Sequence, residues 1–136
     1  MREKAGKHSW KRKAAYLVLL LAAACAGLQR PVPVGPGIGE KTIDMTASSY
    51  RFTPNNIKAQ LGDTLILKVK NTAHIEHNIT VHDPENYEVL SVYLPPGQTR
   101  EVKIKLDHTG RYYFFCRIAF HEMLGMFGQI TVTAAR

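Results

Sequence analysis

Short stretches in which hydrophobic and polar residues alternate fill the chain from residue 40 onward. In residues 64–70, Leu65, Leu67 and Val69 alternate with polar side chains, and only Ile66 breaks the pattern. A period of two predicts a strand with one face in a core and the other in water. Segments of this kind are residues 41–47, 57–60, 64–70, 77–81, 89–94, 99–106, 112–116 and 129–133, of which 89–94 is the least regular.

Turn-forming residues separate these segments at regular intervals. Gly, Pro, Asn and Asp gather in residues 61–63, 83–86, 95–98 and 107–110, and Asn71 ends another segment. This rhythm is typical of a β-sandwich or barrel, and neither an amphipathic helix nor an internal repeat is visible. The sequence therefore predicts one all-β domain of about seven to eight strands.

The residues before this domain have a different character. Residues 1–13 are basic and residues 14–28 are uncharged and apolar, which is the pattern of a signal peptide and is short for a transmembrane helix. Residues 29–39 hold six Pro and Gly residues, which predicts a linker without regular elements. We therefore expect a leader or anchor in 1–28, a linker in 29–39 that holds the domain off a membrane surface, and a folded domain in 40–136.

The net charge of +7 belongs mostly to the leader. Six of the 18 Lys and Arg residues but only one of the 11 acidic residues precede residue 26, so the remainder carries twelve basic and ten acidic side chains. No basic stripe remains in the folded part, and we expect no nucleic-acid partner. The leader instead predicts export to the periplasm or the outer face of the cytoplasmic membrane.

The two cysteines, Cys25 and Cys116, are predicted to have separate roles. A disulfide between them is conceivable in an exported protein, but Cys25 lies inside the leader. Residues 21–25 resemble a lipoprotein processing box, although Ala22 stands where Leu is usual. Lipidation of Cys25, cleavage nearby and an uncleaved anchor remain open. Each outcome leaves Cys116 as the single thiol of the folded domain, free to bind a metal.

A thiolate, an imidazole and a thioether lie within eleven residues near the end of the chain: Cys116, His121 and Met126. Two His, one Cys and a weak axial Met form the ligand set of blue-copper electron-transfer sites. In the strand 112–116, Tyr112, Phe114 and Cys116 share one face. If that face is the core, the sulfur points into an apolar, water-poor region that suits a copper thiolate.

A second His must then come from a neighbouring strand. His77 is favoured because it opens a strand just after a break, and the next residue, Asn78, could brace a neighbouring loop by hydrogen bonding. His82 is the alternative, followed by His74 and His108. For these three, a solvated histidine is the simpler interpretation.

The residues gathered so far resemble the cupredoxin family. The resemblance rests on the motifs at 71–78, 116–128 and 130–132 and on the turns at 61–64, 94–99 and 109–113. It covers about residues 40–135, and the four-residue gaps from Cys116 to His121 and from His121 to Met126 are similar to longer-loop members. It implies a Greek-key β-sandwich or barrel and one copper ion cycling between Cu(I) and Cu(II). By the resemblance, His77, Cys116 and His121 are equatorial ligands and Met126 is the axial one.

Two nearby side chains could alter this ligand set. Met123 is a second thioether, but it follows His121 too closely to reach an axial position easily. Glu76 precedes His77 and would signal a different copper centre, but a strand neighbour should face the other way. We therefore expect both to be exposed.

The functional prediction is a one-electron carrier and not an enzyme. Redox partners are expected to dock at an apolar patch around His121, with Arg117 and Glu122 at its rim; the apolar residues are Ala119, Phe120, Met123, Leu124 and Phe127. A second partner is the membrane, reached through the leader or a lipidated Cys25. A periplasmic protein that binds copper for delivery or storage is the alternative. An oxidase or nitrite reductase would need further copper centres, and zinc rarely takes thioether ligands.

Overall fold

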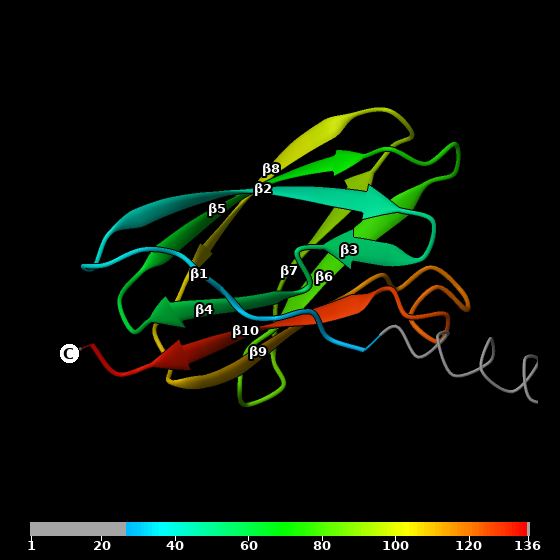
Figure 1. The fold of residues 1–136 in the computed structure, drawn as a ribbon. Helices are drawn as coiled ribbons and strands as arrows, with labels where there is room; N and C mark the ends of the chain where they lie inside the picture. Colours follow the sequence, from blue (N-terminus) through cyan, green and yellow to red (C-terminus); the bar gives the residue numbers. More distant parts are fainter. Residues whose placement is uncertain (1–26, 136) are drawn as a thin grey trace, which may run out of the picture.

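Two β-sheets pack face to face in the structure, a computed structural model that describes residues 27–135 (Figure 1). One sheet has the order β1-β4-β10-β9-β6-β7 and the other has the order β3-β2-β5-β8. The strands are β1 (Val32–Pro33), β2 (Glu40–Ser48), β3 (Arg51–Thr53), β4 (Asn56–Gln60), β5 (Thr64–Asn71), β6 (His77–His82), β7 (Glu88–Leu94), β8 (Thr99–Lys105), β9 (Gly110–Phe115) and β10 (Phe127–Thr133).

The connections repeatedly cross between the sheets. Strand β4 lies in one sheet and β5 in the other, and β10 returns at the end of the chain to pair parallel with β4. Strand β2 pairs parallel with β5, whereas β9 and β10 form an antiparallel pair. The copper-ligand candidates all belong to the six-stranded sheet, because His77 opens β6 and the other three lie on the loop between β9 and β10, and β6 pairs with β9.

The core lies between the sheets and is made of the inward-facing positions of the alternating strands. Leu65, Leu67 and Val69 of β5 are buried, while Lys68 and Lys70 are exposed. The largest fully buried side chains are Tyr112, Phe52, Phe114, Met45, Ile57, Leu65, Leu67, Ile79, Leu94, Ile104, Leu106 and Met126. Burial of this apolar surface is the main force that holds the sandwich together.

Two buried polar side chains fix the turns at the end of the sandwich far from the copper-ligand candidates. Asp63 is fully buried and its carboxylate accepts hydrogen bonds from the backbone N–H of Gly39 and of Gln60. The Tyr112 hydroxyl donates to Asp107 at 3.0 Å and accepts from the backbone N–H of His108 at 3.2 Å. Each otherwise costly buried polar group is therefore satisfied.

The predicted all-β sandwich is confirmed, and every predicted strand is present with boundaries shifted by at most two residues. The described residues hold ten strands, more than predicted, because β1 and β3 are too short to show a period. The expectation that residues 29–39 form no regular element is wrong at Val32–Pro33, which pairs parallel with β4. The other predictions for residues 1–26, including the role of Cys25, lie outside the described residues.

In residues 27–135, no helix is long and apolar enough to cross a membrane.

Candidate metal centre

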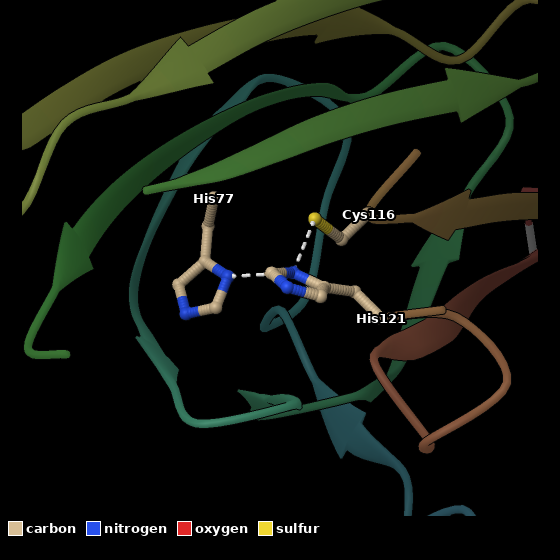
Figure 2. Close-up of side chains that lie close together, drawn as sticks. All are labelled: His77, Cys116 and His121. Carbon is tan, nitrogen blue, oxygen red and sulfur yellow. Dashed lines mark hydrogen bonds between the residues drawn. The ribbon is translucent and has the colours of Figure 1, made fainter. Parts of the chain in front are cut away.

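Three candidate ligands, His77, Cys116 and His121, meet at one end of the sandwich (Figure 2). All three side chains are buried, and their ligand atoms lie within 4.8 Å of one another. The Nδ1 atoms of His77 and His121 are 3.2 Å apart, and the Cys116 Sγ is 3.4 Å from the Nδ1 of His121. Two ring nitrogens and one sulfur thus point toward a common centre.

His77 opens β6, and the loop before it is held by a buried side chain. Asn71 is fully buried at the end of β5, where its Nδ2 donates to the carbonyls of Ile75 and Leu94, each at 2.9 Å. Its Oδ1 accepts from the backbone N–H of Ala73. The amide therefore satisfies three backbone groups at once and fixes where the chain re-enters the sheet as His77.

Cys116 follows β9 and points into the core, as the parity with Tyr112 and Phe114 predicted. Its sulfur accepts a hydrogen bond from the backbone N–H of Asn78 at 3.3 Å. The Asn78 side chain in turn accepts from the backbone N–H of Arg117 at 3.1 Å. Asn78 therefore links the strand that carries His77 to the loop that carries His121, in the bracing role that the sequence suggested.

The loop from Cys116 to Met126 is closed by its own backbone. The N–H of Cys116 donates to the carbonyl of Met126, and the N–H of Met126 donates to the carbonyl of His121, both at 3.0 Å. Gly125, with a φ of 105°, takes a conformation that favours glycine and turns the chain back toward β10. The main chain thus fixes the spacing of all three loop ligands.

Just after the loop, Gly128 is required for packing. A Cβ at this position would overlap the Phe114 ring and the carbonyl oxygen of Asn55. Only glycine lets the Phe114 ring and the Asn55 carbonyl pack this closely against β10, and Phe114 lies two residues before Cys116 on the same face.

The arrangement fits a metal ion. Ligand atoms about 2.0–2.3 Å from an ion and spread around it stand roughly 3.2–3.7 Å from one another, which matches the two distances above. The Nε2 of His77 is buried and has no hydrogen-bond partner among the described residues, so the ring has no competing contact that would turn Nδ1 away. Thiolate and imidazole together favour a soft or borderline metal such as copper or zinc over magnesium or calcium.

Burial sets the protonation of the site. Desolvation, assisted by the neighbouring His121, lowers the pKa of His77 to about 4, so this imidazole is neutral and available as a ligand at neutral pH. Desolvation raises the pKa of the Cys116 thiol, while the backbone amides of Ile118 and Asn78 oppose the increase. Because a bound metal needs the thiolate, metal binding displaces the thiol proton.

The fourth predicted ligand, Met126, is fully buried and is tied through its backbone to both Cys116 and His121. The alternatives lie elsewhere. His74, His82 and His108 are outside the cluster, and Met123 is 84% exposed. Glu76 is exposed and accepts a hydrogen bond from Tyr93, so it points away from the cluster.

Two contributors to the site were not predicted from the sequence. The Tyr50 ring meets the His121 ring edge-on, with centroids 5.0 Å apart, and covers one side of it. Tyr50 sits in the tight turn between β2 and β3 with a φ of 58°, and no periodic signal marks it. The anchoring role of Asn71 was missed too, although its place at a strand end before a loop is a weak sequence signal for such a role.

Known proteins give a consistent comparison. The family model for the cupredoxin-like domain matches residues 14–132. Plastocyanin from Ginkgo biloba is 34% identical over 91 residues, covering 60% of this chain and 86% of that protein. Multicopper oxidase mco from Staphylococcus haemolyticus is 29% identical over 112 residues, which cover 66% of this chain but only 25% of the oxidase.

Among solved structures, reduced auracyanin from Roseiflexus castenholzii superposes with a TM-score of 0.60 at 19% identity, covering 73% of this chain and 99% of auracyanin. This likeness concerns the fold. The sequence match, the two-sheet sandwich and the His–Cys–His cluster at its end agree with one another. The chain therefore belongs to the cupredoxin-like domain family, and its cluster is the site of a single copper ion.

Proposed function

We propose that the protein is a one-electron carrier whose single copper ion is held by His77, Cys116 and His121, with Met126 as the weak axial ligand. The observation that carries this proposal is the convergence of the two Nδ1 atoms and the sulfur on one buried point. When bound, copper supplies one-electron chemistry between Cu(I) and Cu(II).

The frame around the ligands supports electron transfer. Each ligand is held by a strand end or by backbone hydrogen bonds, so a change in the charge of the site meets little freedom to rearrange. The Asn78 N–H bond to the Cys116 sulfur and the apolar walls around it are the features expected to tune the potential. Phe114 is buried in the core on the same strand face as Cys116, whereas Phe120 is 72% exposed.

We propose no catalytic reaction for this chain. The described residues hold one His and Cys cluster, and the oxidases that the chain resembles are about four times as long as the matched part. The matched part of this chain corresponds to only 25% of such an oxidase.

A patch on the same end of the molecule is the proposed docking surface for redox partners. His121 itself is only 8% exposed, but the loop around it carries three strongly exposed apolar side chains, Phe120, Met123 and Leu124. We call these three residues the copper-end patch. The predicted rim residues have local partners, since Arg117 pairs with Glu88 and Glu122 accepts from Tyr113. Small apolar surfaces of this kind suit brief redox encounters.

We place the protein outside the cytoplasm, in the periplasm or on the outer face of the cytoplasmic membrane. The support is the basic and then apolar sequence of residues 1–28, followed directly by the domain. The strength of membrane attachment depends on whether this segment is lipidated at Cys25, cleaved or kept as an anchor.

A spectrum and a redox titration test the proposed function. The chain from residue 27 onward, which retains every contact described above, is loaded with Cu(II) and compared with its Cys116→Ser variant. We expect an intense visible thiolate-to-copper band, reversible one-electron reduction, and loss of the band in the variant. A copper-loaded protein without such a band would contradict the carrier function. A band that vanishes quickly on addition of a chelator would favour copper delivery or storage instead.

A further inference from the structure

The chain joins the domain beside the copper loop. The backbone N–H of Gln29 donates to the Asn55 side chain, and the carbonyl of Gln29 accepts from the Asn56 side chain, each at 2.8 Å. Asn55 is buried, and its carbonyl accepts from the N–H of Gln129, three residues after Met126. Figure 1 shows the start of the described chain at the same end of the sandwich as the loop between β9 and β10.

From there the chain runs along the sandwich as a fixed strap. Val34 N–H donates to the carbonyl of Lys58, and Val32–Pro33 pairs with β4. At the far end, Gly39 N–H donates to the buried Asp63, and its carbonyl accepts from Thr64. Residues 29–39 are therefore bonded at both ends and in the middle. They are not the slack spacer that their Pro and Gly content predicts.

This geometry removes any spacer between the apolar leader and the domain. The uncharged run ends at Leu28, and the next residue is already bonded to Asn55 and Asn56. One residue spans at most about 3.6 Å. Whatever the leader attaches to must therefore lie close to the copper end of the domain and not at the opposite end.

We propose that the leader stays attached to the membrane and that the strap turns the copper end toward it, so that the partner at the copper-end patch is a membrane-embedded redox protein. Phe120, Met123 and Leu124 are 72%, 84% and 57% exposed. Their loop, between β9 and β10, lies at the end of the sandwich where the described chain begins (Figure 1). Confinement to one membrane raises the effective concentration of such a partner, so a small patch suffices. This inference rests on the proposed carrier function.

The test measures access to the copper in phosphatidylcholine vesicles that carry the full chain. The comparison is a variant with about 20 Gly and Ser residues inserted between Leu28 and Gln29, a linker that spans roughly 25 Å. Reduced cytochrome c serves as a soluble protein-sized donor and ascorbate as a small one. We expect the insertion to speed reduction by cytochrome c about tenfold or more, while ascorbate reduces both forms at similar rates.

Equal cytochrome c rates in the two forms would overturn the inference and indicate a soluble partner. Recovery of the full chain free of vesicles would overturn it as well, because the leader would then be no anchor. The visible band, recorded in the same samples, separates the two proposals. If the band is present and the rates are equal, only the orientation is wrong; if the band is absent, the carrier function fails and the inference fails with it.

Discussion

Asn78 shows how one side chain can couple two parts of a metal site. Its backbone N–H contacts the Cys116 sulfur, its Oδ1 accepts from Arg117 N–H, and its Nδ2 donates to Ser91. It therefore holds the ligand loop against β6 without touching the metal position through its side chain. A defect here should alter the metal site more than the fold.

Replacing Asn78 with Ala should destabilise the domain by about 1–2 kcal/mol, because its side-chain hydrogen bonds with the Arg117 N–H, the Thr80 hydroxyl and Ser91 are lost. We also expect faster copper loss to a chelator and a shifted visible band. Urea unfolding and chelator kinetics measure the two effects. Ser91→Ala is the matched control, since it removes one partner of Asn78 but leaves Arg117 bonded; equal effects in both variants would contradict the bracing role.

The candidate site could be identified from residue types and spacing, but its geometry could not. Cys116, His121 and Met126 stand out in the sequence because three soft or borderline ligands rarely occur so close together, and strand parity correctly placed the Cys116 sulfur in the core. His77 could be favoured only by its place after a break. The contact of Tyr50 with His121 depends on a turn more than seventy residues away in the chain, which no local pattern reveals.

Strands β9 and β10 position the ligand loop, and Gly128 leaves room for the Phe114 ring of β9 to pack against β10. Strands with strong alternation were predicted well, because one buried face leaves a clear period in the sequence. β1 and β3 were missed for the opposite reason. β1 consists of two exposed residues held by backbone pairing, and β3 offers a single buried side chain, Phe52.

Gly128→Ala should destabilise the domain by about 1–3 kcal/mol, because the new methyl group forces the Phe114 ring or the Asn55 carbonyl to move. The urea midpoint measures this loss. Gly27→Ala is the control, since a Cβ there meets nothing within 4 Å. If both substitutions leave the midpoint unchanged, the Phe114 ring and the Asn55 carbonyl do not pack against Gly128 as tightly as described.

The loop between these strands also carries the proposed docking surface. Leu124→Glu places a charge in the copper-end patch, so we expect slower electron exchange with the natural partner and an unchanged visible band. Stopped-flow mixing with membranes that contain the partner measures the rate. Val89→Glu changes a residue of β7 with 43% exposure that lies outside the patch, and it should leave the rate intact. Unchanged exchange in Leu124→Glu would remove the patch as the docking surface.

The boundaries of the folded unit differ from what composition indicates. A domain starting at residue 40 is the natural prediction, because Pro and Gly are dense before it. The structure places the strap of residues 29–39 on the sandwich through backbone pairing and the side chains of Asn55, Asn56 and Asp63. Composition reports the lack of a helix or long strand here, but it carries no information on such long-range bonds.

A chain that starts at residue 40 should therefore be less stable than one that starts at residue 27, by roughly 2–5 kcal/mol for several lost hydrogen bonds. The ligands all follow residue 40, so the visible band should remain. Thermal unfolding of the two copper-free chains measures the difference. Coinciding melting curves would show that the strap contributes nothing to the fold.

The long separation of the ligands along the chain affects the point during synthesis at which the protein can bind copper firmly. His77 and His121 are 44 residues apart, and the hydrogen bond from the Cys116 N–H to the Met126 carbonyl lies directly before β10, which pairs with β9 and β4. A chain that ends before β10 keeps all four ligand side chains but lacks the strand pairings beside the loop, so we expect it to bind copper much more weakly. Firm copper binding should therefore report that the last strand is in place.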